Sequence, residues 1–297
     1  MKTIELETPK QTPALLQTTG ADAVIQSLKA EGVKTIFGYP GGAIMPIYDA
    51  LFDHLEEVNH VLTRHEQGAI HAAQGYARTS GKTGVVFATS GPGATNLITG
   101  LADALIDSTP LVCITGQVAS HLLGTDAFQE TDVMGISMPV TKWNCQVTKA
   151  EDIAPTLAKA FYIASSGRPG PVLVDITKDA QFEKLDFSYE KCTAVRSFQP
   201  KPKLNADQLQ AASKLLNEAK KPLMIVGQGI MLSNAEEELL VFAEKTGVPV
   251  ASTLLGLGAF PANHPQFVGM VGMHGNYAPN VKSNECDVLL AVGMRFD

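Results

Sequence analysis

The sequence predicts an α/β fold with a doubly wound parallel sheet, followed by part of a second, Rossmann-like α/β domain. From about residue 18 onward, segments of helix length alternate with short apolar segments of strand length. Apolar runs such as TGVVFAT and PLVCITG show no polar alternation, which is typical of strands covered on both faces. The predicted strand VKTIF runs into the Gly-rich loop GYPGG, and TGVVFAT runs into SGPG. Both loops follow the carboxyl ends of strands, where such sheets bind ligands.

The first domain, residues 1–185, is expected to begin with a helix in TTGADAVIQSLKAEG, because Thr19 is a suitable N-cap and Gly32 a suitable stop. The strand VKTIF then ends in the loop GYPGGAIMP, and a short helix around IYDALFD leads to the strand VNHVLT. The stretch RHEQGAIHAAQGYART is rich in small residues and predicts a closely packed helix with one carboxylate, Glu66, near its start. The strand TGVVFAT, the loop SGPGATN, a helix in LITGLADALID and the strand PLVCITG complete the alternation.

Residues 186–204 contain polar and proline punctuation and predict a linker. In the second domain, residues 205–297, Asn205 is a candidate helix cap before the strand PLMIVG. Ser233 with Glu236 predicts a capping box, and the strand PVAST follows. The sequence stops at Asp297, directly after the apolar strand DVLLAVGM, without a helix to cover that strand. We therefore expect an N-terminal fragment of a longer protein.

Composition and charge restrict the partners. The chain has 23 basic and 30 acidic residues, a net charge of −7 and no long basic run, which argues against nucleic acid and anionic membrane surfaces as partners. Its four cysteines form no CxxC pair, as expected for free thiols in a reducing compartment. The N-terminus has no signal-peptide or transit pattern, and no apolar run is long enough for a membrane helix. We expect a soluble, cytoplasmic protein.

Several motifs fail as sites when taken alone. HEQGAIH has Ala69 where the zinc motif HExxH needs its second histidine, and SGKTG lacks the spacing of a phosphate-binding loop, so no metal site is predicted. GQGIML has Leu232 where the dinucleotide fingerprint needs its third glycine. By position alone, Glu66 is more simply an acid favoured by the positive end of a helix dipole. By position alone, Lys178 is more simply a solvated surface lysine, and Arg168 could simply belong to a surface loop.

Taken together, the motifs change this interpretation. FGYPGGAIMP, RHEQGA, TSGPGATN, GQV, GTDAFQE, SGRPGPVLVDI, GMHG and VGMRFD occur in an order that closely resembles the acetohydroxyacid synthase (acetolactate synthase) family of thiamine diphosphate enzymes. The resemblance implies three α/β domains in the catalytic subunit: one for the cofactor's aminopyrimidine, a central one that contributes to FAD binding, and a third whose GDG…N signature holds diphosphate and Mg²⁺. No GDG occurs in this sequence, so the resemblance covers the first domain and part of the second. We expect this chain alone to be inactive.

The resemblance also assigns residues. Glu66 matches the glutamate that hydrogen-bonds the N1′ nitrogen of the aminopyrimidine and shares a proton with it, which a dry site favours. Further thiamine diphosphate contacts are expected at Tyr39, Pro40, Gly41, Thr89, Pro92, Asn96 and Gln129. Substrate contacts are expected at Gly42, Phe128, Gln129 and Lys178. FAD contacts are expected at Arg168, Gly227, Gly229, Thr253, Leu254, Met273, His274, Gly293, Arg295 and Asp297.

The implied reaction is the decarboxylation of pyruvate and condensation with a second 2-keto acid to 2-acetolactate or 2-aceto-2-hydroxybutyrate, in branched-chain amino-acid synthesis. The family's pocket is completed by a neighbouring subunit, so a homodimer or tetramer is expected, with a small regulatory subunit as a further candidate partner. The alternatives are another thiamine enzyme, such as an FAD-containing pyruvate oxidase, and a non-catalytic binding or assembly module. Keto-acid preference, feedback regulation and oligomer number have no signature in the sequence.

Overall fold

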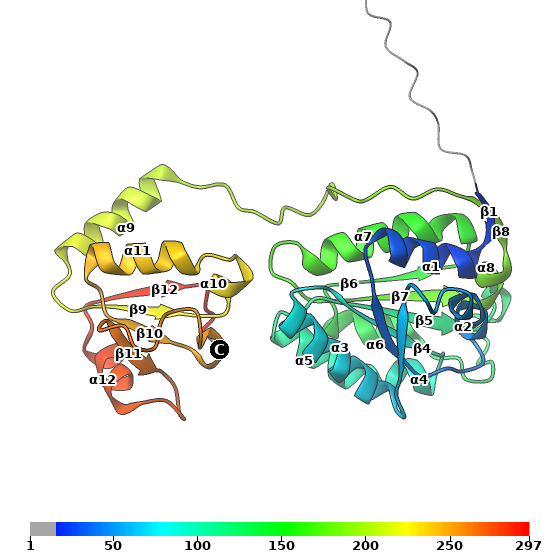
Figure 1. Ribbon diagram of the computed structural model, residues 1–297, viewed down its shortest axis with the longest axis horizontal. Helices are drawn as coiled ribbons and strands as arrows, with labels where there is room; N and C mark the ends of the chain where they lie inside the picture. Colours follow the sequence, from blue (N-terminus) through cyan, green and yellow to red (C-terminus); the bar gives the residue numbers. More distant parts are fainter. Residues whose placement is uncertain (1–15, 297) are drawn as a thin grey trace, which may run out of the picture. The chain divides into compact units, whose positions relative to one another are not determined.

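The computed structural model describes residues 16–296, and the chain divides into two compact units between Pro202 and Lys203 (Figure 1). Asp297, one of the expected FAD contacts, lies outside the described residues. None of the helices in the described part has the length and apolar character needed to cross a membrane.

The first unit contains a six-stranded sheet in which every neighbouring pair is parallel. In spatial order its strands are β3 (Asn59–Leu62), β2 (Thr35–Gly38), β4 (Gly84–Ala88), β5 (Leu111–Gln117), β7 (Pro171–Thr177) and β6 (Trp143–Val147). The chain runs outward from β2 to β3 and then returns past β2 to form β4. The sheet therefore has its topological switch point between β2 and β4, where open α/β sheets bind ligands.

Helices cover both faces of this sheet, and the predicted doubly wound α/β fold is confirmed (Figure 1). Alternate residues of β4 show the division: Val85 and Phe87 enter one apolar core, and Val86 and Ala88 enter the other. The first core is closed by α1 (Gly20–Ala30), α2 (Met45–Phe52), α7 (Ile153–Ser165) and α8 (Lys178–Phe182), and the second by α3 (Glu66–Ser80), α5 (Ile98–Ile106) and α6 (Val133–Ser137).

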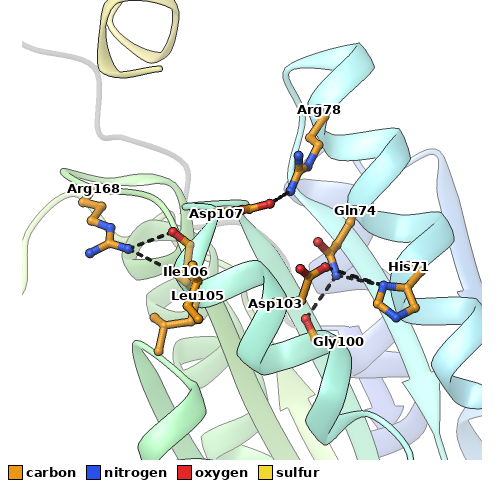
Figure 2. Close-up of polar contacts among 9 residues, drawn as sticks. All are labelled: His71, Gln74, Arg78, Gly100, Asp103, Leu105, Ile106, Asp107 and Arg168. Carbon is orange, nitrogen blue, oxygen red and sulfur yellow. Dashed lines mark hydrogen bonds and ion pairs between the residues drawn. The ribbon is translucent and has the colours of Figure 1, made fainter. Parts of the chain in front are cut away.

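The helices α3 and α5 lie in close contact. A Cβ on Gly100 of α5 would lie 2.1 Å from the Ile70 Cγ2. Beside this contact the buried Gln74 Nε2 donates a hydrogen bond to the Gly100 carbonyl, at 3.1 Å (Figure 2). Arg78 and Asp107 form an ion pair between the same two helices (Figure 2). This packing fixes α3, and with it the position of Glu66 at its first turn.

The ends of the first unit are joined by a short antiparallel pair, β1 (Leu16–Thr19) with β8 (Lys184–Phe187). Thr19, the last residue of β1, caps α1 as predicted, because its hydroxyl accepts a hydrogen bond from the Asp22 amide at 3.2 Å. The chain then continues through residues 188–205 without a long helix or strand.

The second unit contains a four-stranded parallel sheet, in the order β11 (Phe267–Met270), β10 (Val250–Ser252), β9 (Pro222–Val226), β12 (Val288–Val292). Its helices are α9 (Ala206–Glu218), α10 (Gly229–Leu232), α11 (Glu236–Thr246) and α12 (Tyr277–Glu285). The predicted cap Asn205 is confirmed, since its Oδ1 accepts hydrogen bonds from the Asp207 and Gln208 amides.

The predicted capping box at Ser233 and Glu236 is wrong. The residue before α11 is Ala235, which makes no side-chain cap. The Ser233 amide instead donates back to the carbonyls of Gly229 and Ile230, so this serine ends α10. Asn234 then takes a φ of 50°, a left-handed conformation that asparagine tolerates better than most residues, and the next helix begins after this turn.

Candidate active site

Glu66 is a buried carboxylate at the first turn of α3, with 7% of its surface exposed. The residue before it, His65, caps the helix through its Nδ1, which accepts a hydrogen bond from the Gln67 amide at 3.1 Å. A carboxylate is favoured at this end of a helix by the macrodipole. Burial of a charged group is costly unless the group has partners, and Asn96 supplies one: its Nδ2 donates to the Glu66 Oε2 at 2.9 Å. The place of Glu66 at the start of a helix thus explains in part why an acid occurs here, whereas so deep a burial is uncommon for a carboxylate.

Loops from the switch point of the sheet lie against Glu66. Gly93, in the short helix α4 (Pro92–Thr95) after β4, has a Cβ position only 3.2 Å from the Glu66 Oε1 and 2.7 Å from the Thr89 Cγ2. A Cβ on Gly41, in the loop after β2, would lie 2.5 Å from the Thr89 side chain. The Thr89 hydroxyl accepts a hydrogen bond from the Ala43 amide at 3.2 Å. The structure therefore brings together the two Gly-rich loops and the acid that the sequence singles out.

The remaining residues of these loops lie at the same edge of the sheet. Tyr39, Pro40 and Gly42 follow β2 directly and are exposed to solvent. Pro92 is exposed at the first position of α4, and Asn96 ends that helix. The exposed residues of both loops therefore lie at the edge of the sheet where the loops pack beside Glu66.

Tyr48 and His60 lie beside this site and had no motif to reveal them. The Tyr48 hydroxyl and the His60 Nε2 are 3.3 Å apart, and their rings meet edge to face. Burial, and then the charge of Glu66, raises the pKa of Tyr48 far above its usual value. Burial also lowers the pKa of His60, so the pair favours two neutral rings. Their signal in the sequence is only an aromatic residue on α2 and a polar one in the edge strand β3.

A second missed group is Asp175 of β7, a carboxylate with no exposed surface. Its Oδ1 accepts a hydrogen bond from the Thr115 hydroxyl at 2.6 Å, and its Oδ2 accepts from the amides of Gln117 and Gln146 at 3.1 and 3.0 Å. Burial raises its pKa even though these three bonds act in the opposite direction. Gln117 also donates to the Thr131 carbonyl at 3.1 Å, so this network anchors the end of the loop that carries Phe128 and Gln129.

That loop meets the loop after β4. Gln129 has a φ of 58°, and a Cβ on Gly91 would lie 2.5 Å from the Gln129 carbonyl oxygen. Phe128, in the same loop, is 87% exposed. Lys178 begins α8 at the end of β7 and is partly exposed. The structure thus places Phe128 and Gln129 next to the Gly-rich loop, and Lys178 at the carboxyl edge of the same sheet.

Arg168 has a structural role within the first unit. Its Nε donates to the Ser108 hydroxyl at 2.9 Å. Its Nη2 donates to the carbonyls of Leu105 and Ile106 at 2.8 and 3.1 Å (Figure 2). A guanidinium suits these carbonyls at the carboxyl end of α5, because they carry the negative end of the helix dipole. A contact of Arg168 with FAD stays a prediction.

The other expected FAD residues lie in the second unit. A Cβ on Gly227 would lie 2.4 Å from the Gly293 carbonyl oxygen, and the Gly229 amide donates to that oxygen at 2.8 Å. Packing of the turn after β9 on the end of β12 therefore already explains these glycines. The Thr253 hydroxyl accepts from the Gly256 amide at 3.1 Å. The remaining four expected residues of the described part are exposed to solvent: Leu254, Met273, His274 and Arg295.

Comparison with known proteins gives matches along most of the chain. Residues 18–136 match the family model "Thiamine pyrophosphate enzyme, N-terminal TPP binding domain", and residues 209–297 match "Thiamine pyrophosphate enzyme, central domain". The chain is 51% identical over 280 residues to the probable acetolactate synthase large subunit of Methanocaldococcus jannaschii, covering 93% of this chain and 47% of that protein.

Two bacterial relatives give the same result. The acetolactate synthase large subunit of Corynebacterium glutamicum is 53% identical, with 94% of this chain and 44% of that protein covered. The acetolactate synthase large subunit of Haemophilus influenzae is 51% identical, with 94% of this chain and 49% of that protein covered. The chain thus spans about half the length of the curated relatives it matches.

Proposed function

The chain belongs to the family of thiamine pyrophosphate enzymes, and from this membership we propose that it carries out its part of acetolactate synthase chemistry. The reaction is the decarboxylation of pyruvate and the joining of the two-carbon unit to a second 2-keto acid, with 2-acetolactate or 2-aceto-2-hydroxybutyrate as product. The observation that carries this proposal is the buried carboxylate of Glu66 between two Gly-rich loops at the switch point of a parallel sheet.

The residues around Glu66 fit the aminopyrimidine half of thiamine diphosphate. Where Gly41 and Gly93 stand, any side chain would collide with Thr89, so only glycine leaves these loops their present path. Tyr39, Pro40, Pro92 and Gln129 would supply the other contacts. When bound, the cofactor supplies an electron sink for decarboxylation and a carbon nucleophile for the carbon–carbon bond.

Glu66 would hold a proton at its Oε1 and share it with the N1′ nitrogen of the ring. Asn96 leaves that oxygen available, because its amide donates to the Oε2. A buried carboxyl favours proton sharing over a bare charge, and the exclusion of water would strengthen each electrostatic contact in the site. Gly42, Phe128, Gln129 and Lys178 would face the keto acids, with the ammonium of Lys178 suited to an incoming carboxylate.

The proposal extends to partners and further cofactors. FAD would bind the second unit through Thr253 and the exposed residues Leu254, Met273, His274 and Arg295, and it would have a structural role. Arg168 stays a separate candidate for an FAD contact. Mg²⁺ would hold the diphosphate through ligands outside the described residues. We further propose a cytoplasmic homodimer or tetramer. We also propose a small regulatory subunit, and the words "large subunit" in the relatives' names support this partner alone.

The test is product analysis. The chain, and a longer protein that contains it, are each incubated with thiamine diphosphate, Mg²⁺, FAD and pyruvate, and acetolactate is measured together with oxygen uptake. Acetolactate without oxygen uptake from the longer protein supports the synthase. Phosphate-dependent oxygen consumption without acetolactate would support a pyruvate oxidase instead, and no turnover with retained flavin binding would support an assembly module.

A further inference from the structure

The loop that carries Phe128 and Gln129 has an unusual backbone. Gly124, Asp126 and Gln129 all have positive φ angles, of 76°, 58° and 58°. Only Gly124 adopts such a conformation without cost, whereas the two other residues are strained by contact of the Cβ with the backbone. Strain of this kind persists only where surrounding interactions over-determine the conformation, and it is common at functional sites.

The interactions that hold this loop come from one carboxylate. Glu130 accepts hydrogen bonds from three backbone amides of the residues just before it: Gly124, Thr125 at 3.2 Å and Ala127 at 3.0 Å. These bonds, led by that from Gly124, hold the pKa of Glu130 below its usual value. Hydrogen bonds to an ionised acceptor are stronger than neutral ones, so the carboxylate can offset the strain of the two residues it encloses.

The position of the loop is fixed on its other side by contact with the loop after β4. A Cβ on Gly91 would lie within 3.0 Å of three backbone atoms of Gln129, so the two backbones are in direct contact. Gly91 precedes α4, whose Gly93 lies beside Glu66. A change in the path of residues 124–130 would therefore move Gln129 relative to the candidate active site.

We propose that Glu130 is the positioning residue of the substrate side of this site. Its carboxylate closes residues 124–130 into one conformation and thereby holds Phe128 and Gln129 at a fixed position beside the loop after β4. Glu130 touches neither substrate nor cofactor in this role, and it acts through the backbone that it binds. The positioning of keto acids rests on the proposed function, whereas the closure of the loop does not.

The experiment compares Glu130→Gln and Glu130→Asp with Glu151→Gln, a matched change at an exposed glutamate whose ion pair with Lys149 is long, at 3.9 Å. Hydrogen exchange is measured on the whole chain at the amides of Gly124, Thr125 and Ala127. Glutamine has one acceptor and no charge, so exchange at these amides should quicken by about tenfold or more. The shorter aspartate should give an intermediate value, and Glu151→Gln should leave the exchange unchanged.

The second readout is the kinetics of a protein that forms acetolactate. A misplaced loop should raise the KM for pyruvate by about tenfold in Glu130→Gln, with a smaller change in kcat, whereas partial unfolding would lower the apparent kcat alone. Unchanged exchange at the three amides, or faster exchange with an unchanged KM, would overturn the proposal. Exchange needs no turnover, so a failure of the proposed function would leave that arm of the test intact.

Discussion

Removal of the Asn96 side chain should destabilise the first unit through Glu66. In Asn96→Ala, the Glu66 Oε2 loses its donor at 2.9 Å while the carboxylate stays 7% exposed. A hydrogen bond to a charged group contributes about 1.5–3 kcal/mol, and we expect a loss of unfolding free energy in this range. If Glu66 is first changed to Gln, the same removal should cost only about 0.5–1.5 kcal/mol, because the acceptor is then neutral.

Urea unfolding followed by tryptophan fluorescence measures this effect selectively. Trp143 is the single tryptophan of the chain and lies in β6 of the first unit, so its signal reports that unit. Asn59→Ala is the control, because Asn59 is exposed in β3 and its side chain makes no hydrogen bond within residues 16–296. The double-mutant cycle should give a coupling of about 1 kcal/mol or more between Asn96 and Glu66. A coupling near zero, or an Asn96→Ala loss no larger than that of the control, would refute the reasoning.

Three further predictions concern packing, pH and substrate. Gly100→Ala puts a Cβ 2.1 Å from a side-chain carbon of α3 and should lower the unfolding free energy in urea by about 1–3 kcal/mol. Gly75→Ala, in open space on α3, should raise it by about 0.4–1 kcal/mol, and equal effects of the two changes would contradict close packing of α3 on α5. Hydrogen bonds from two backbone amides hold the pKa of Asp287 below its usual value, so the carboxylate stabilises the second unit above the ordinary aspartate pKa, and this stabilisation is lost as pH falls through the lowered pKa. Asp287→Asn should remove this acid dependence of hydrogen exchange in the second unit, and a pH profile identical to that of the unchanged chain would contradict the prediction. Lys178→Ala should weaken the use of keto acids in steady-state kinetics more than Lys184→Ala does, and equal KM values would exclude a substrate role.

Much of the fold could be predicted from local sequence signals. The apolar runs of β4 and β5 predicted two-sided burial, and both strands are buried at every position. The caps Thr19 and Asn205 were also predictable, because a side-chain oxygen before an apolar helix has few other roles. The pairing of β1 with β8 was not, since it joins segments more than 160 residues apart and neither has a strong strand pattern.

Site residues that belong to a sequence motif could be predicted, and those that are defined only by tertiary contacts could not. Glu66 and the two Gly-rich loops stand out in the sequence, and the structure brings them together. Asp175 lies inside an apolar strand, and nothing local shows that three side chains from β5 and β6 donate to it. The glycines at 227 and 293 suggested a ligand, yet close packing of their own backbones already accounts for them.

The most direct test of the account is the turnover of Glu66→Gln in a protein that forms acetolactate. Glutamine keeps the size of the side chain and can still accept a hydrogen bond, but it cannot hold the shared proton. We predict a fall in kcat of about two to four orders of magnitude, with unchanged unfolding of the first unit beyond the loss of the charged hydrogen bond. Glu57→Gln, at an exposed ion pair with Lys29, should retain full turnover. Near-normal turnover in Glu66→Gln would mean that this acid only begins a helix, and would contradict the account.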